Sequence, residues 1–189
     1  MSAPYRIAVI VGSLRKGSYN RKTALAMQAL APPELALEIV EIGDLPLYNE
    51  DLEGEGKTAP GLWTRFREAV RGSDGVLFFT PEYNRSVPGC LKNAIDVGSR
   101  PYGKSAWSGK PGAVVSVSPS AIGGFGANHA LRQSMVFLNV PMMQQPEAYI
   151  GGAAKLFTDS GALASDDTKK FFTAIITTYA AWVARHAKK

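Results

Sequence analysis

The stretch VIVGSLRKGSYNRKTALAM, residues 9–27, joins an apolar β-branched run to a segment of good helix formers. Its two glycines have the spacing of the first half of a nucleotide P-loop. That motif continues with Lys and Ser or Thr, whereas Ser18 and Tyr19 follow here. The dinucleotide pattern G-x-G-x-x-G also fails, because Leu14 stands in place of its second glycine. The stretch therefore predicts a strand, a loop and a helix without either common nucleotide signature.

Strands and helices are predicted to alternate along the rest of the chain. Strands are expected at residues 5–11, 35–42, 75–80, 112–118 and within 141–151, and helices at 20–30, 63–70, 88–99, 128–138 and 165–187. Such alternation favours a parallel sheet with helices on both faces. With five strands and right-handed crossovers, it fits a doubly wound α/β sheet of order 2-1-3-4-5 in one domain, residues 1–189.

Composition narrows the class of protein. The chain has 189 residues, of which 46% are hydrophobic and 20% charged, and a single cysteine, so no internal disulfide can form. Its N-terminal apolar run is too short for a signal peptide or a membrane span. These features predict a soluble protein of the cytoplasm. The net charge of +5 is scattered along the chain, so we expect small anionic ligands, and neither nucleic acid nor a membrane, as partners.

The loop after the first strand, residues 12–20, has the chemistry of an anion site. Free amides and the helix dipole favour an anion at the start of the following helix. Ser13, Ser18 and Asn20 add short polar groups. Arg15 adds a planar cation that suits phosphate. The loop has no Asp or Glu to arrange Mg²⁺, so it predicts a site that holds a monophosphate. The alternative is an ordinary capped turn.

Two further loops follow strands of the predicted sheet, where doubly wound folds bind ligands. In TPEYNRSVPGCLKNAID, residues 80–96, Pro81 stiffens the exit from the third strand and Tyr83 offers an aromatic wall. This loop is typical of a segment that reads the edge of a planar heterocycle, although it could be a simple turn. In SVSPSAIGGFGANHALRQ, residues 116–133, glycines permit close approach of a ligand, and Ser118 with nearby amides could donate to it.

Together the first two loops closely resemble those of the NADPH-dependent FMN reductases, which include quinone and chromate reductases of flavodoxin-like fold. The resemblance continues through GKPGAVVSVSPSAIGG and LRQSMVFLNVPMMQQPEAYIGG, residues 109–124 and 131–152. It implies bound FMN, with its phosphate in the first loop and its ring along the second. The cofactor-binding residues that it implies are Ser13, Arg15, Ser18, Tyr19, Asn20, Pro81, Glu82, Tyr83, Asn84, Arg85, Ser118 and Gly123. Several relatives have an aromatic residue in place of Arg85, at the mouth of the pocket or the subunit interface.

The activity that the resemblance implies is a ping-pong cycle. A hydride passes from NADPH or NADH to FMN, and two electrons pass on to quinones, chromate, azo compounds or free flavin. It also implies a homodimer or homotetramer. The chemistry belongs to the flavin, so no side chain is assigned as acid or base. The alternatives are an electron carrier, a reductase that supplies free reduced flavin to a monooxygenase, and a binding module without FMN.

The remaining chemically active residues predict no second site. His129 stands near the glycine-rich loop, where it could edge the pocket, and His186 falls in the last turn of the final helix, where a cation suits the dipole. Cys90 is predicted to be a small buried thiol. Because these residues form no Cys/His cluster, we expect no metal site.

Overall fold

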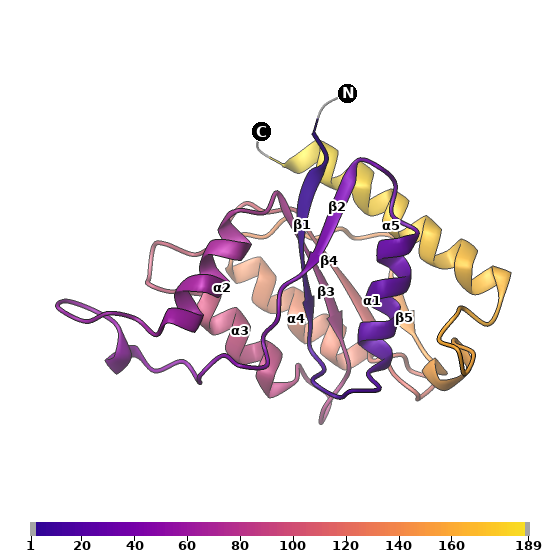
Figure 1. Cartoon of the computed structure of the whole chain (residues 1–189), viewed down its shortest axis with the longest axis horizontal. Coiled ribbons are helices and arrows are strands. Elements are labelled where there is room, and N and C mark those ends of the chain that lie inside the picture. The colour runs from indigo at the N-terminus through magenta and orange to yellow at the C-terminus, as the bar shows by residue number, and fades with distance from the viewer. Residues whose placement is uncertain (1–2, 188–189) are drawn as a thin grey trace.

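A five-stranded parallel sheet forms the centre of the computed structural model, which describes residues 3–187 (Figure 1). Its strands are β1 (Tyr5–Val11), β2 (Leu35–Ile39), β3 (Gly75–Thr80), β4 (Gly112–Val117) and β5 (Ala148–Ile150). The strand order is β2-β1-β3-β4-β5, and every neighbouring pair is parallel. The predicted doubly wound sheet is therefore confirmed, including its order.

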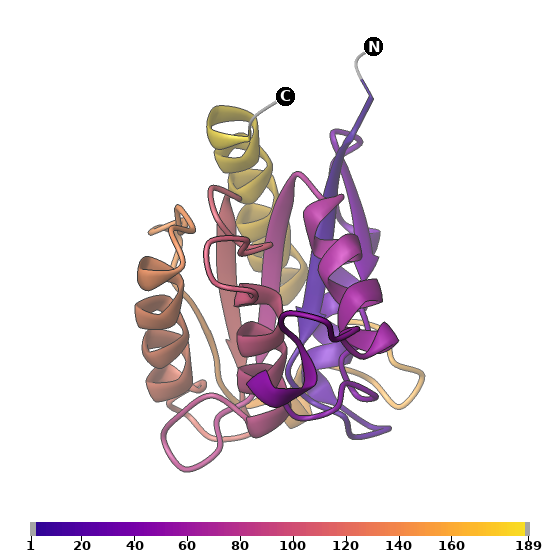
Figure 2. The same cartoon turned by 90° about the vertical axis from the view of Figure 1, so that its left-hand side faces the viewer.

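Helices cover both faces of this sheet (Figures 1 and 2). They are α1 (Tyr19–Ala29), α2 (Gly61–Arg71), α3 (Gly89–Ser99), α4 (Phe125–Phe137) and α5 (Asp166–His186), with short 3₁₀ turns at Glu50–Leu52 and Ala153–Lys155. Helices α1 and α5 bury their apolar residues in one core, and α2, α3 and α4 bury theirs in the other. No helix among residues 3–187 is both long and apolar enough to cross a membrane.

Element ends differ from the sequence prediction where distant residues decide them. Strand β2 ends at Ile39, three residues earlier than predicted. A further backbone hydrogen bond to β1 follows it, from the Val40 amide to the Val9 carbonyl at 2.9 Å. Helix α4 begins at Phe125, three residues earlier than predicted. Its N-cap is Gly124, which has φ 76° and no capping side chain. Because a side chain from another loop reaches this helix start, local sequence signals miss it.

The long connection between β2 and α2, residues 40–60, extends beyond α2 in Figure 1 and is anchored by a buried ion pair. The Arg67 guanidinium donates to both carboxylate oxygens of Glu53, at 2.7 and 3.0 Å. Their side chains are only 5% and 8% exposed. Arg67 also donates from Nε to the Val97 carbonyl at 2.8 Å and lies over the Trp63 ring. The connection is thus tied to both α2 and α3.

Candidate functional site

The carboxyl ends of β1, β3 and β4 meet at one edge of the sheet, the lower edge in Figure 1. Their loops enclose a hollow of about 240 Å³. It is lined by Ser13, Arg15, Ser18, Tyr19, Asn20, Pro81, Glu82, Tyr83, Val117, Ser118 and Pro119. All of these except Val117 and Pro119 are among the predicted site residues. The fold therefore brings together, from three loops, most of the residues that the sequence singled out.

The start of α1 provides the anion-binding end of this hollow. Ser18 is the N-cap, and its Oγ accepts the Arg21 amide at 3.2 Å. The first intrahelical hydrogen bond runs from the Lys22 amide to the Ser18 carbonyl. The amides of Tyr19 and Asn20 precede it and have no intrahelical acceptor. With the helix dipole, these amides favour a bound anion at this position.

Arg15 is a cation that lines this hollow and is available to such an anion. Arg21, on the same helix start, is engaged by the Glu41 carboxylate at 2.6 and 3.1 Å. Arg15 lines the hollow, is exposed, and has no ion-pair partner among residues 3–187. Since hydrogen bonds between a guanidinium and phosphate are stronger than neutral ones, Arg15 is the side chain best suited to fix a phosphate here.

Asn20 contributes a second polar group to the wall of the hollow. Its Nδ2 donates to the Val117 carbonyl at 3.1 Å, which ties α1 to the end of β4. The residue is 3% exposed, and its Oδ1 has no hydrogen-bond partner in the described part of the chain. A buried acceptor without a donor costs free energy. The arrangement therefore suits a ligand with a hydroxyl that can donate to Oδ1.

The loop after β3 forms a tight hairpin on the opposite wall. Tyr83 and Ser86 exchange both backbone hydrogen bonds, at 3.1 and 3.0 Å. Asn84 and Arg85 are the two central residues of the turn, with φ values of 51° and 64°. Pro81, Glu82 and Tyr83 line the hollow, whereas Asn84 and Arg85 lie outside its lining. Tyr83 is 51% exposed, so its ring is open to a planar ligand.

The loop after β4 contributes Ser118 but not Gly123. The Ser118 amide donates to the Ile150 carbonyl at 2.9 Å, so Ser118 can contact a ligand only through its hydroxyl. That oxygen accepts the Ser120 amide at 3.2 Å and lies 3.1 Å from the Ser120 hydroxyl. Gly123 does not line the hollow. A Cβ at this position would lie 2.6 Å from the carbonyl carbon of Tyr149. Gly123 is therefore needed for close packing against β5, which the glycine-rich sequence did not distinguish from ligand binding.

A second, larger hollow of about 410 Å³ adjoins the first, with which it shares Arg15 and Tyr83. Its other lining residues are Gly12, Leu14, Pro88, Gly89 and Cys90. Sequence analysis missed it, because Leu14 and Pro88 carry no chemical signal and Cys90 was expected to be buried. Burial raises the pKa of the half-buried Cys90 thiol and outweighs hydrogen bonds from nearby backbone amides. The thiol is therefore protonated at neutral pH and a poor nucleophile.

The two histidines lie outside both hollows. His129 joins an aromatic cluster on α4 and β5, where its Nε2 is 2.9 Å from the Tyr149 hydroxyl. That hydroxyl donates to Glu147 at 2.9 Å, and burial together with the Glu147 hydrogen bond and charge raises the Tyr149 pKa. His186 lies beside Trp182 near the end of α5, with ring centroids 4.0 Å apart. Neither residue reaches the candidate site.

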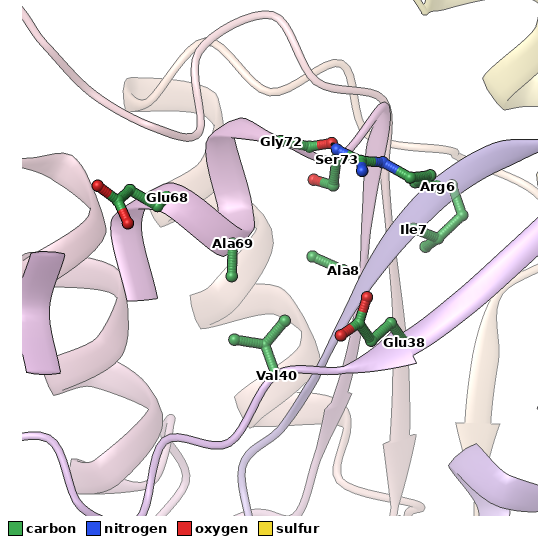
Figure 3. A pocket seen from close by; sticks show the side chains of 9 residues that line it. All are labelled: Arg6, Ile7, Ala8, Glu38, Val40, Glu68, Ala69, Gly72 and Ser73. Carbon is green, nitrogen blue, oxygen red and sulfur yellow. The ribbon is translucent and has the colours of Figure 1, made fainter. Parts of the chain in front are cut away.

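Another hollow, of about 250 Å³, lies at the opposite end of the sheet, between the start of β1, β2 and the end of α2 (Figure 3). Its cation, Arg6, donates to the Gly72 carbonyl, and the Arg6 amide donates to Asp74. Figure 3 shows the Glu68 carboxylate turned away from the other lining side chains. Doubly wound sheets bind ligands at the carboxyl ends of their strands, so this hollow is not the candidate site.

Comparison with known proteins decides the family. The model of the NADPH-dependent FMN reductases matches residues 5–155. The chain belongs to this family. It is 70% identical over 183 residues to a quinone reductase of Pseudomonas putida, covering 97% of each chain. It is 43% identical to a 2-hydroxy-1,4-benzoquinone reductase of a Burkholderia species, covering 94% of this chain and 96% of that one.

The fold of this FMN reductase also matches a solved enzyme. FerB, a flavoenzyme NAD(P)H:(acceptor) oxidoreductase from Paracoccus denitrificans, superposes with a TM-score of 0.90 at 40% identity. The match covers 97% of this chain and all of that chain. The structure thus agrees with the sequence in placing the chain among FMN-dependent oxidoreductases that use NAD(P)H.

The first hollow has the donor set that FMN requires. FMN carries one phosphate, a polyol chain and a planar ring. The amides at the start of α1 and Arg15 suit the phosphate, and the partnerless Oδ1 of Asn20 suits a hydroxyl of the polyol. The exposed ring of Tyr83 and the hydroxyl of Ser118 suit the planar ring. The residues present therefore fit the family's cofactor.

Proposed function

We propose that the protein is an FMN-dependent NAD(P)H:quinone oxidoreductase that works by a ping-pong cycle. In the balanced reaction, NAD(P)H, a proton and a quinone give NAD(P)⁺ and a hydroquinone. The observation that carries this proposal is the pair of adjoining hollows. One combines the start of α1 with Arg15, which suits a monophosphate, and the other is lined mainly by apolar groups. The relatives named as quinone reductases support the choice of acceptor.

Each wall of the first hollow has a distinct role in this proposal. Ser13, Ser18 and Arg15 would hold the phosphate, together with the amides of Tyr19 and Asn20. Pro81, Tyr83 and Ser118 would orient the ring. Glu82, Asn84 and Arg85 would act through the turn that shapes this segment. When bound, FMN supplies the two-electron chemistry, accepting a hydride and later releasing two electrons. The protein supplies binding and orientation.

The second hollow suits the acceptor. It adjoins the proposed flavin site at Tyr83, and its Leu14, Pro88 and Gly89 offer apolar contact to a flat quinone. Arg15 at the shared rim would attract anionic substrates, which extends the proposal to chromate and to anionic azo compounds. We assign the Cys90 thiol a packing role, because it contacts the Gly12 carbonyl at 3.6 Å and is a poor nucleophile. The one proton that the balanced reaction consumes comes from solvent.

We further propose a homodimer or homotetramer in the cytoplasm, as the resemblance implies. Tyr102, Val136 and Phe137 are 85%, 76% and 78% exposed, and large exposed apolar side chains of this kind are typical of interfaces between subunits. The aromatic residue that several relatives have is replaced by Arg85 in this chain, which places a cation on the exposed turn near the site.

Steady-state kinetics test the ping-pong proposal. Initial rates with NADPH at several fixed concentrations of 1,4-benzoquinone are expected to give parallel double-reciprocal lines, because NADP⁺ leaves before the quinone binds. The same protein stripped of FMN serves as the control, and activity should return when FMN is added. Intersecting lines would contradict the ping-pong order. Loss of FMN on desalting, with rapid reduction of added free flavin, would instead favour a reductase that supplies flavin to another enzyme.

A further inference from the structure

The carboxylate of Glu82 connects two loops of the candidate site. One oxygen, Oε2, accepts the backbone amide of Ala127 in the first turn of α4, at 3.0 Å. The other, Oε1, accepts from the Arg85 guanidinium at 3.2 Å. The Glu82 side chain is only 13% exposed. Both carboxylate oxygens therefore accept hydrogen bonds from the protein, from Arg85, 3 residues away in the chain, and from Ala127, 45 residues away.

The start of α4 is shaped to receive this carboxylate. Its N-cap residue, Gly124, provides no side chain, so the carboxylate of Glu82 takes the place of a local cap. A Cβ on Gly126 would lie 2.9 Å from the Glu82 Oε2 and 2.8 Å from the Arg85 carbonyl oxygen. A negative charge beside the first-turn amides is also stabilised by the helix dipole. Two glycines and one carboxylate thus form a close junction between the loops.

The hairpin needs such an anchor. Asn84 and Arg85 both have positive φ, a conformation that costs free energy in residues with a side chain and persists when surrounding contacts hold it. Glu82 precedes this turn, and it lines the first hollow together with Pro81, Tyr83 and Ser118. Holding Glu82 against α4 therefore fixes the distance between the loop after β3 and the loop after β4.

We propose that Glu82 is a positioning residue, whose hydrogen bond to the Ala127 amide sets the width of the flavin hollow. The carboxylate acts through the hairpin rather than by contact with the flavin. The inference rests on the proposed function, because it concerns how the hollow is held ready for FMN. The hydrogen bond matters more than the charge, since Arg85 is 76% exposed and its ion pair with Glu82 contributes little.

Two substitutions separate the hydrogen bond from the charge. Glu82→Gln keeps an oxygen that can accept the Ala127 amide but removes the charge. Glu82→Asp keeps the charge but shortens the side chain by one methylene and withdraws it from Ala127. FMN affinity of the apo-proteins is measured by quenching of flavin fluorescence, and melting temperatures of the same apo-proteins are recorded. Glu34→Gln, at an exposed position between α1 and β2, is the matched control.

The aspartate variant is expected to bind FMN about tenfold or more weakly than the wild type, since a lost hydrogen bond to a charged group has this magnitude. The glutamine variant should stay within about threefold of the wild type. A weakened glutamine variant beside an aspartate variant of wild-type affinity would show that the charge decides, and would overturn the proposal. So would a lower melting temperature with unchanged affinity, which indicates a purely structural role. Failure of the wild type to bind FMN would instead contradict the proposed function.

Discussion

Replacing Arg67 by methionine is expected to lower the free energy of unfolding by about 3–5 kcal/mol. The substitution leaves the Glu53 carboxylate, 8% exposed, without its cation and removes the donor to the Val97 carbonyl. Taking one partner from a buried ion pair costs far more than the pair itself contributes, because an uncompensated charge stays in a medium of low polarity. Urea unfolding of the apo-protein at pH 7 measures the difference.

A matched control lies two residues away on the same helix. Arg65→Met breaks an ion pair with Asp44 at a similar distance, 2.8 Å, but these side chains are 54% and 49% exposed. Its expected cost is below about 1 kcal/mol. The double variant Arg67→Met with Glu53→Leu should recover most of the lost stability, since it removes both charges. Equal effects at Arg65 and Arg67 would contradict the assignment of a buried pair.

Replacing Arg15 by alanine is expected to weaken FMN binding by about tenfold to a hundredfold, the range for a hydrogen bond to a charged group. Arg15 is exposed, lines both hollows, and has no carboxylate partner in the described residues. Its removal leaves the core intact, so the apo-protein should melt as the wild type does. Quenching of flavin fluorescence measures the affinity, and thermal unfolding checks the fold.

Lys16→Ala is the matched control for this experiment. Lys16 is the next residue, carries the same charge, is exposed, and lines neither hollow. Its removal is expected to change FMN affinity by less than about threefold, through the general field alone. An equal loss of FMN affinity in the two variants would show that the net charge near the phosphate, and not a specific contact with Arg15, determines binding. An Arg15 variant with wild-type affinity would place the phosphate elsewhere.

The features that could be predicted from the sequence are those that local signals determine. The strand order could be predicted from the alternation of apolar runs with segments of helix formers, together with the rule of right-handed crossovers. The start of α1 could be predicted because its cap, Ser18, lies in the loop itself. From the strand order, the convergence of Arg15, Tyr83 and Ser118 on one hollow follows directly. Their contacts with FMN remain predictions.

What the sequence could not provide depends on pairs of residues far apart in the chain. The start of α4 is set by Glu82, 45 residues before Ala127. Ser118 and nearby amides were expected to donate to a ligand, but the Ser118 amide donates to the Ile150 carbonyl on β5. Gly123 is needed because a side chain at this position would clash with the backbone of Tyr149. None of these contacts leaves a periodic or motif signal, so only the folded arrangement distinguishes packing from binding.

An anaerobic absorbance titration of the desalted protein tests the central claim most directly. NADPH is added first and 1,4-benzoquinone second, while the absorbance of bound flavin is followed. We expect a yellow protein that is bleached by one equivalent of NADPH and recovers its colour with one equivalent of the quinone. A yellow protein that NADPH leaves unbleached would be an electron carrier instead. A colourless protein that acquires no flavin spectrum with added FMN would contradict the assignment of the hollow.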